Sequence, residues 1–555
     1  MADPLKKFFP FDNYRTHQME IIIKIAKAFK SGKKNVILEA PTGTGKSIIG
    51  VTVANIFKTA YFITAQKILQ QQYLNDFPDI VDLKGRNAYP CWFMMEHMNS
   101  KKYYGCDKGQ CAKKNKSFLK ICTERDRCPY KNQLDLALGS DQVLFNFSSF
   151  LFQREMADRF TNEKKLLVID ECHGLEQQIM NFVEVTIFQK DIDEKLPKYE
   201  SVDEYLKFFK SIELGMKLNQ KIVDLRRDLQ ELTGEVLTDS EEGSTKFSPG
   251  SLGSSEAASE DQELANNILK EINEHKSVLS KYNALREYAQ NVKCVCEYNS
   301  KEKSICIKPL YATYHTPKLL LNGGKHRLFM SATVLNPTVF GNSIGLNMSE
   351  TQYISVPHTF PVKNRLIHLD YAGPMDFKSR SKTMPKMIKK IDALMTKHGD
   401  EKGIIHCQSF NLMKEIAAGV SAKNRGRLLD QKMFKNNKDD LLKAHGISHN
   451  TVIIAPAMHE GLDLKNDLSR FQIVAKVPYP DSRDNKQLKI RSDESWDYYL
   501  WLVALKLIQS CGRSVRSETD FASTYILDAS FDKFFNMADN ARLLPDWFIE
   551  SLVVD

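Results

Sequence analysis

Residues 35–57, NVILEAPTGTGKSIIGVTVANIF, decide the fold. They read as an apolar strand, a glycine-bearing turn and an apolar-periodic helix. Glycines in such a turn let backbone N–H groups curl around a phosphate at a helix N-terminus, while Lys46 reaches the terminal phosphates and the Ser47 hydroxyl ligates Mg²⁺. Ala40 stands where such loops usually have their first glycine. The stretch predicts nucleotide contacts from Ala40, Pro41, Thr42, Gly43, Thr44, Gly45, Lys46 and Ser47.

A second apolar strand, residues 166–169 in KKLLVIDECHGLE, ends in two adjacent carboxylates, Asp170 and Glu171. Two such groups at the C-terminal end of a strand divide the work of hydrolysis. Asp170 holds Mg²⁺, and Glu171 polarises the attacking water as general base. The alternative interpretation, two solvated acids at a strand end, is disfavoured because a phosphate loop accompanies them.

Further short motifs follow in a set order. D-E-C-H at 170–173 resembles the D-E-A-H box of superfamily 2 helicases, with Cys172 in place of alanine. NYRTHQ, with Arg15 and Gln18, resembles the adenine-reading element of these enzymes, and YFITAQKILQQQYLNDF resembles motif Ia. The remaining resemblances are MSAT with Ser331, Ala332 and Thr333 to motif III, IIHCQSF to motif IV, HEGLDL with Glu460, Gly461 and Asp463 to motif V, and QSCGRSVR to motif VI.

This resemblance implies two RecA-like domains with ATP in the cleft between them. Gln509 would contact the nucleotide or its attacking water, and Arg513 and Arg516 would reach the γ-phosphate, where planar cations stabilise spread charge. Asp463 joins the nucleotide contacts by the same resemblance. The hydroxyls of Ser331 and Thr333 would couple the ATP site to a bound strand. Surface salt bridges are the alternative for the two arginines, and turn formation is the alternative for the two hydroxyls.

Residues 91–130 concentrate five of the eleven cysteines. Without a secretion signal a disulfide framework is improbable, so the cluster indicates metal binding. The flanking phrases LKGRNAYPC and CPYKNQLDLALGSDQVLFNFSSFL resemble the XPD and DinG family of iron–sulfur helicases, which implies a [4Fe–4S] cluster held by Cys₄ ligation. The expected ligands are Cys91, Cys106, Cys111 and Cys128, with Cys122 as the alternative for the third position. Zinc is the rival metal, because tetrahedral thiolate sites also suit Zn²⁺.

The cysteine-rich segment is also basic. Residues 91–131 carry ten Lys or Arg against four Asp or Glu, interleaved with aromatic side chains. Cations follow a phosphate backbone and aromatic faces stack on unpaired bases, so the segment predicts a grip on single-stranded DNA. A solvated charged face is the alternative interpretation.

The expected fold class is α/β, with two RecA-like P-loop domains and an iron–sulfur cluster insertion and a helical arch insertion in the first. Residues 201–232 and 263–292 are amphipathic with helical periodicity and predict two long helices. The Gly/Ser/acid-rich stretch between them predicts a disordered loop at about 234–262. The predicted parts are 1–88, 134–175 and 308–345 for the first helicase domain, 89–133 for the cluster domain, 176–307 for the arch-like insertion, and 346–555 for the second helicase domain.

The net charge and the distribution of apolar residues indicate the kind of partner and the cellular setting. A formal charge of +9 suits a polyanionic partner. The first fifteen residues lack the apolar core of a signal peptide, and no run approaches the ~18 to 20 apolar residues of a membrane span, so a soluble intracellular protein is expected, nucleoid-associated in a prokaryotic or viral setting.

By resemblance, the leading hypothesis is an ATP- and Mg²⁺-dependent 5′-to-3′ DNA helicase of repair or replication. It would act as a monomer on single-stranded DNA and on tailed duplexes. The alternative is a nucleic-acid-stimulated ATPase that remodels protein–DNA or RNA complexes without processive unwinding. A non-catalytic DNA-binding scaffold is disfavoured because all of the residues expected to carry catalysis are present. They are Lys46, Asp170, Glu171, Gln509, Arg513 and Arg516.

Overall fold

The protein was analysed as a computed structural model. The structure describes residues 3–65, 67–97, 104–109, 122–192, 194–233, 256–358, 360–434, 437–456, 464, 466–481, 485–512, 514–515 and 517–554. None of the helices in these ranges is long and apolar enough to cross a membrane.

The first domain is built on a seven-stranded parallel sheet. Its strand β1 (Asn35–Glu39), which lies next to the edge strand, is buried at every position, as expected for a sheet covered by helices on both faces. The phosphate-loop sequence joins β1 to α2 (Lys46–Phe57) at the C-terminal edge of this sheet. The strand order is β10 (Thr351–Ser355), β1, β9 (Gly324–Ser331), β5 (Lys164–Asp170), β2 (Ala60–Thr64), β4 (Gln142–Asn146) and β3 (Val81–Leu83).

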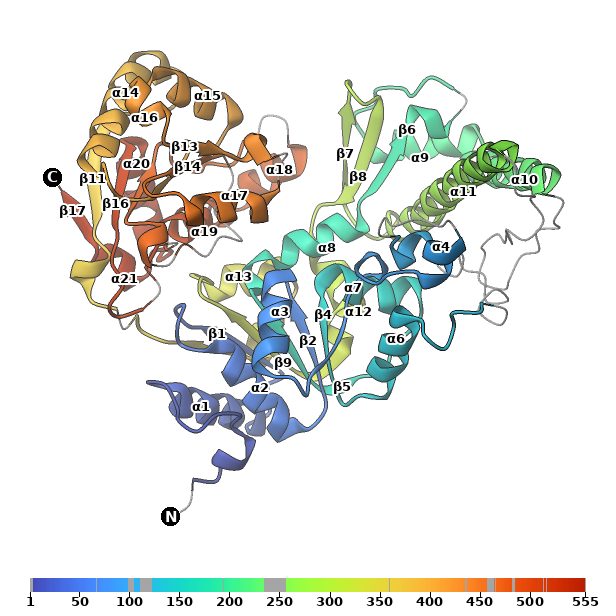
Figure 1. Ribbon diagram of the computed structural model, residues 1–555, viewed down its shortest axis with the longest axis horizontal. Helices are drawn as coiled ribbons and strands as arrows, with labels where there is room; N and C mark the ends of the chain where they lie inside the picture. Colours follow the sequence, from blue (N-terminus) through green and yellow to red (C-terminus); the bar gives the residue numbers. More distant parts are fainter. Residues whose placement is uncertain are drawn as a thin grey trace.

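A second seven-stranded parallel sheet forms the other domain, drawn in orange and red in Figure 1. Its strand order is β13 (Leu428–Asp430), β14 (Val452–Ala455), β12 (Gly403–His406), β15 (Phe471–Val474), β16 (Ser523–Asp528), β11 (Ile367–Gly373) and β17 (Leu552–Val554). Helices that flank it include α14 (Arg380–Lys397), α18 (Lys486–Glu494) and α19 (Trp496–Cys511). Two parallel-sheet α/β domains confirm the α/β class and the two RecA-like domains of the predicted fold.

The first sheet extends past its predicted end at residue 345. β10 pairs in register with β1, with Asn35 opposite Thr351 and Glu39 opposite Ser355. The chain therefore changes from the first sheet to the second after Ser355, because a further edge strand is needed to cover β1. The sequence analysis had assigned residues 346–355 to the second domain.

An insertion after the D-E-C-H box contains a small sheet that the sequence analysis did not predict. Strands β6 (Val185–Phe188), β8 (Ser304–Pro309) and β7 (Cys294–Asn299) pair antiparallel in the order β6-β8-β7. Helices α9 (Val202–Ser211), α10 (Leu214–Thr233) and α11 (Glu256–Tyr288) accompany this sheet on the side of the molecule away from the second domain's sheet (Figure 1). The arch-like insertion is thus mixed α and β rather than helical.

The helices of the insertion also differ from prediction. The first expected helix is interrupted between α9 and α10, where Glu213 adopts a left-handed φ of 53°. The second begins at Glu256, inside the stretch predicted to be a disordered loop. Residues 234–255 of that predicted loop lie outside the described residues.

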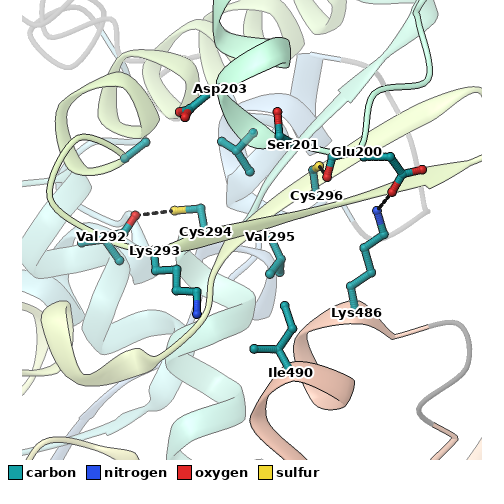
Figure 2. Close-up of a pocket in the computed structure, with 12 residues that line it drawn as sticks. Glu200, Ser201, Asp203, Val292, Lys293, Cys294, Val295, Cys296, Lys486 and Ile490 are labelled. Carbon is teal, nitrogen blue, oxygen red and sulfur yellow. Dashed lines mark hydrogen bonds and ion pairs between the residues drawn. The ribbon is translucent and has the colours of Figure 1, made fainter. Parts of the chain in front are cut away.

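The insertion touches the second domain at α18. Lys486 of α18 pairs with Glu200, and Lys293 Nζ lies 3.2 Å from a carboxylate oxygen of Glu494. A cavity of about 390 Å³ lies at this junction and is lined by both parts. Figure 2 shows residues of its lining, among them Cys294. Its lining comes from the insertion and α18 rather than from the phosphate loop.

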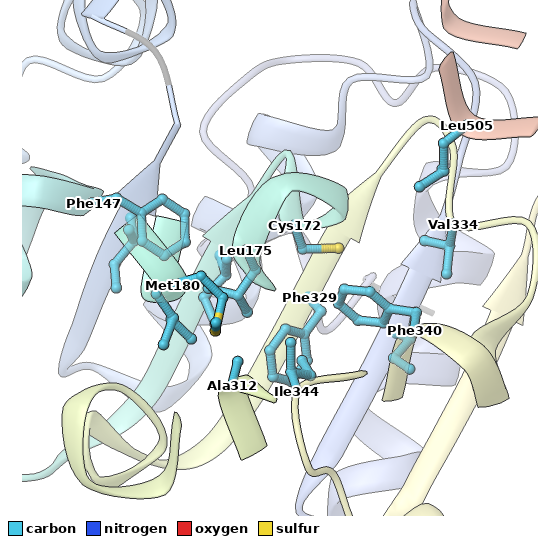
Figure 3. Close-up of a cluster of buried hydrophobic side chains, with 14 of the residues drawn as sticks. Phe147, Cys172, Leu175, Met180, Ala312, Phe329, Val334, Phe340, Ile344 and Leu505 are labelled. Carbon is cyan, nitrogen blue, oxygen red and sulfur yellow. The ribbon is translucent and has the colours of Figure 1, made fainter. Parts of the chain in front are cut away.

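The two RecA-like domains share one hydrophobic core. Phe329 and Phe340 of the first domain belong to the same buried cluster as Trp501 and Leu505 of α19. Figure 3 shows Leu505 approaching Val334, which follows the MSAT motif. Helix α19 is therefore buried against the first domain beside the MSAT motif.

Candidate active site

The phosphate loop has the backbone shape that its glycines predict. Gly43 and Gly45 have φ values of 87° and 80°, a region that side chains with a Cβ disfavour. A Cβ on Gly45 would also clash with the amide of Gln18. The position therefore requires glycine.

Arg15 and Gln18, predicted to read adenine, both contact the phosphate loop. Arg15 Nη1 donates to the carbonyl oxygen of Gly43 at 2.9 Å, and Gln18 Nε2 donates to that of Thr44 at 2.9 Å. The Gln18 amide oxygen accepts the Arg15 N–H at 2.8 Å. The two side chains thus tie the N-terminal segment to the loop.

Lys46 begins α2 and folds back on its own loop. Its Nζ donates to the carbonyl oxygen of Ala40 at 3.1 Å. The Ala40 N–H in turn donates to the carbonyl oxygen of Ser331 at 3.0 Å, which fastens the loop to the end of β9. Ala40 is fully buried, so the methyl group that replaces the usual glycine hydrogen lies in the core.

The two predicted Mg²⁺ ligands, Ser47 and Asp170, meet at one tyrosine hydroxyl. Tyr73 lies on α3 (Lys67–Asp76), and its hydroxyl donates to Asp170 Oδ2 at 3.0 Å and also interacts with the Ser47 side chain. A hydroxyl and a carboxylate are hard oxygen donors, the kind that Mg²⁺ prefers. Their chemistry and proximity fit the predicted ion.

Burial changes the ionisation of this pair. Desolvation, followed by the charge of Glu171, raises the pKa of Asp170 to about 6, while the charge of Lys46 opposes the shift. Desolvation and the Asp170 charge also raise the pKa of Tyr73 well above its usual value, so Tyr73 remains a hydrogen-bond donor. The sequence analysis missed Tyr73, although it lies within the motif Ia resemblance, because nothing local distinguishes it from a core aromatic.

Glu171, the predicted general base, adopts a left-handed conformation with φ of 54°. Non-glycine residues held in this region are strained and cluster at functional sites. One of its carboxylate oxygens lies 3.3 Å from His173 Nδ1, and the same nitrogen lies 2.9 Å from the Ser331 hydroxyl. His173 was not singled out from the sequence, yet it joins the D-E-C-H box to the MSAT motif.

The contacts continue into the second domain. The Ser331 hydroxyl donates to the carbonyl oxygen of Thr333 at 3.2 Å and accepts its N–H at 3.1 Å. Gln509 Nε2, from α19, donates to Thr333 Oγ1 at 3.3 Å. The predicted carboxylate, the MSAT hydroxyls and Gln509 therefore form one chain of contacts across the domain boundary.

Cys172, the departure from the usual alanine, lies in the shared core and is fully buried (Figure 3). Burial and the neighbouring acids raise the pKa of its thiol well above the usual value. It therefore behaves as a small apolar side chain. Arg513, Arg516, Asp463, Glu460 and Gly461 lie outside the described residues, and so does Cys111.

Four of the clustered cysteines are described, and backbone contacts bring their segments together. Pro90 and Gly105 form an antiparallel bridge, the Cys91 N–H donates to the Tyr104 oxygen at 2.8 Å, and the Cys106 N–H donates to the Tyr89 oxygen at 2.7 Å. This arrangement places Cys91 and Cys106 on neighbouring backbone segments.

Their side chains form two groups. A hydrogen bond from Cys106 is the main cause that lowers the pKa of Cys128 to about 6, which favours the thiolate that metals bind. Cys91 and Cys122 pack in one small cluster with Tyr104. Among the described residues, no three Cys, His, Asp or Glu side chains lie close enough to hold a metal ion. Thiols are the donors that an iron–sulfur cluster takes, and Cys122 lies beside the expected ligand Cys91.

Comparisons with known proteins agree with this arrangement at both ends of the chain. Residues 393–551 match a family model described as a helicase C-terminal domain, and residues 12–216 match one described as the res subunit of type III restriction enzymes. No curated protein matches the sequence.

Among solved structures, a chain named "XPD_Helicase" is 16% identical, with a TM-score of 0.64 over 98% of this chain and 100% of that chain. Xpd4 of S. tokodaii is 13% identical, with a TM-score of 0.58 over 98% and 100%. A further chain, "XPD_APO", is 14% identical, with a TM-score of 0.57 over 97% and 100%.

The two parallel-sheet α/β domains and the phosphate loop therefore have the fold of the XPD helicase structures. Nearly the whole chain is similar in fold to the XPD structures, and residues 393–551 are similar to a helicase C-terminal domain.

Proposed function

We propose that the protein is an ATP-dependent 5′-to-3′ DNA helicase that translocates on single-stranded DNA, as a monomer inside the cell, in repair or replication. The observation that carries this proposal is the chain of contacts from Glu171 through His173 and Ser331 to Thr333 and Gln509. It connects the end of β5 to α19, so hydrolysis at one domain can alter the docking of the other. The direction and the DNA substrate come from the family resemblance.

In the proposed reaction, Ser47 and Asp170 hold Mg²⁺ and Lys46 contacts the terminal phosphates. Glu171 takes the proton of the attacking water. Gln509 positions the nucleotide or that water, and Arg513 and Arg516 offset charge on the γ-phosphate. Mg²⁺ favours the ionised form of its ligands, so ion binding should offset the burial that raises the pKa of Asp170.

We further propose that Cys91, Cys106 and Cys128 hold a [4Fe–4S] cluster with Cys111 or Cys122. Bound there, the cluster would cross-link a small segment that grips single-stranded DNA. Support comes from the contact between Cys106 and Cys128 and from the bridge that joins the Cys91 and Cys106 segments.

A strand-displacement assay run beside an ATPase assay tests the activity. We expect ATP-dependent displacement from DNA duplexes with a 5′ tail, and none from Glu171→Gln protein. Displacement only from 3′-tailed duplexes would overturn the direction. Strand-stimulated ATP hydrolysis without displacement from either DNA or RNA duplexes would favour the remodelling ATPase instead.

The cluster has its own test. Protein purified without oxygen should be brown, absorb near ~400 nm and contain about four irons per chain. Cys122→Ser protein should keep the colour if Cys111 is the ligand, and Cys111→Ser protein should keep it if Cys122 is. A colourless, zinc-loaded wild type would refute the cluster and leave the helicase proposal standing.

A further inference from the structure

Glu39, the last residue of β1, is a buried carboxylate that the proposed reaction does not use. It is only 8% exposed, and burial raises its pKa. Its Oε1 accepts the N–H groups of Val334 at 3.0 Å and Leu335 at 3.1 Å, and Tyr353 donates its hydroxyl to Oε2. The contacting donors in the described part of the chain are neutral, so Glu39 forms no ion pair there. A carboxylate kept in the core at this cost needs a structural reason.

The segment that Glu39 holds is a strained turn. Leu335 has a φ of 65°, and the Asn336 N–H donates to the carbonyl oxygen of Val334 at 2.8 Å. A hydrogen bond between residues two apart around a centre with positive φ defines the rarer, strained form of the γ-turn. A leucine persists in this conformation only where its surroundings hold it, and the two N–H groups held by Glu39 belong to Leu335 itself and to the residue before it.

The same turn is where the second domain docks. Trp501 Nε1, from α19, donates to the carbonyl oxygen of Val334 at 2.9 Å. Gln509, two turns farther along α19, contacts Thr333. Trp501 is 1% exposed, so its N–H depends on this acceptor. Glu39 therefore binds one side of a turn whose other side receives α19.

We infer that Glu39 is a positioning residue: it holds the strained turn at Val334–Leu335 in the shape that docks α19 and so places Gln509 over the ATP site. This inference rests on the proposed ATP hydrolysis but assigns Glu39 no contact with nucleotide. This role requires the Glu39 carboxylate oxygens to lie within hydrogen-bond distance of the turn, and it does not require the negative charge. An error of an ångström in such a support can cost up to ~10²-fold in rate.

Two substitutions separate reach from charge. Glu39→Gln keeps the length and an acceptor oxygen but loses the charge, whereas Glu39→Asp keeps the charge and withdraws the carboxylate by one methylene. We expect Glu39→Asp to lower the strand-stimulated kcat by ~10-fold or more, with KM for ATP within about twofold of wild type. Glu39→Gln should stay within about threefold of the wild-type kcat. Equal losses in both variants, or a parallel rise in KM, would overturn the inference.

Substitutions of the strained residue, Leu335, test whether relief of the strain restores the kcat lost in Glu39→Asp. Glycine adopts positive φ without strain, so Leu335→Gly added to Glu39→Asp should restore much of the lost kcat. Leu335→Ala removes the same side chain beyond Cβ without easing the backbone, and it should restore nothing. Equal rescue by alanine and glycine would show that the turn's conformation is not what Glu39 maintains.

A spectroscopic measurement tests the role of Glu39 even if the protein hydrolyses no ATP. A lack of hydrolysis would refute the proposed function without bearing on the docking of α19. With Trp92, Trp496 and Trp547 replaced by phenylalanine, Trp501 is the sole tryptophan of the four. Its emission should shift to longer wavelength in the Glu39→Asp protein and stay unchanged in the Glu39→Gln protein. An unchanged Trp501 emission in folded Glu39→Asp protein would refute the docking role.

Discussion

At the scale of single residues, the proposed division of labour between Asp170 and Glu171 gives the first prediction. Glu171→Gln should retain Mg·ATP binding, because Asp170 and the phosphate loop survive, while kcat falls by ~10²-fold or more with loss of the base. Nucleotide titration and steady-state hydrolysis, measured on the same preparation, check both halves. Lys46→Ala is the contrasting variant and should weaken binding as well. An undiminished rate in the glutamine variant would remove Glu171 from the proposed role.

Tyr73 gives a second prediction at this scale. Its hydroxyl bonds the ionised form of Asp170, so Tyr73→Phe should raise the pKa of Asp170 further above its ordinary value. Protons would then compete with Mg²⁺ at higher pH, and the Mg²⁺ affinity should fall by ~10-fold near neutrality, the lower range for a group that supports a metal ligand. Mg²⁺ titrations of ATP hydrolysis should show this loss shrinking as pH rises. A loss independent of pH would contradict the explanation.

At the scale of elements, the segment that leads from β10 into β11 contains a buried histidine with a lowered pKa. His358 packs against Phe360 and Trp547, and its Nδ1 accepts the Phe360 N–H at 3.2 Å. Burial, with a smaller effect of Arg365, lowers its pKa from 6.5 to about 4. The folded protein therefore holds this ring neutral over a range in which the unfolded chain takes up a proton.

This difference in pKa makes the stability of the folded protein depend on pH. Above pH 6.5 the ring is neutral in both states, and between about 6.5 and 4 only the unfolded state is protonated, so stability falls as pH falls. His358→Phe should flatten this dependence in urea unfolding, at a cost of ~1 kcal/mol near pH 7 for the lost hydrogen bond. An unchanged slope between pH 6.5 and 4 would assign the acid sensitivity to other groups.

Sequence patterns predicted some elements and missed others for a physical reason. Residues 35–57 carry their own signal, because a buried parallel strand is continuously apolar and the glycines mark the turn. Strands β6 to β8 are short and partly polar, and their pairing joins residues far apart, such as Val185 and Ile307. The break at Glu213 has no proline to mark it, and the nearby Gly215 lies inside α10.

The candidate site divides in the same way. Lys46, Ser47, Asp170 and Glu171 were predictable because each motif is contiguous and chemically specific. Tyr73 and Glu39 were not, since their partners lie far along the chain and come into reach only when the strands are assembled. His173 belongs to the D-E-C-H motif, but its contact with Ser331 joins distant residues in the same way. Their residue types are also common in ordinary cores and turns. Single-sequence patterns therefore mark the groups that we propose to act on the nucleotide better than those that would position them.

At the scale of the whole molecule, a buried ion pair joins the two domains. Arg491 of α18 donates to Glu176, five residues after Glu171, and the two side chains are 7% and 9% exposed. Tyr498 donates its hydroxyl to the other Glu176 oxygen at 3.0 Å, and the Arg491 guanidinium lies 3.6 Å from the centre of the Tyr498 ring. The three side chains form a single contact between α8 (Leu175–Val183) and the α18–α19 pair.

Removing one partner should cost more than removing both. Glu176→Ala leaves an unpaired buried guanidinium, and we expect it to lower the free energy of unfolding by ~3 to 5 kcal/mol. Replacing both charges, with Glu176→Leu and Arg491→Met together, should recover most of that loss. Urea unfolding of the single and double variants measures the difference. Additive losses would show that the pair is not coupled.

The late position of β10 governs how this protein can be made. β1 carries the phosphate loop, yet its neighbour β10 pairs Asn35 with Thr351, 316 residues later. At translation speeds of ~5 to 20 residues per second, roughly 15 to 60 seconds pass before the ribosome delivers that partner. The other neighbour, β9, pairs Asn35 with Arg327 and arrives almost as late, so both edges of β1 stay open to wrong pairing for most of this time. The ATP site is thus among the first parts synthesised and among the last that can mature, so a growing chain should depend on chaperones to shield this strand.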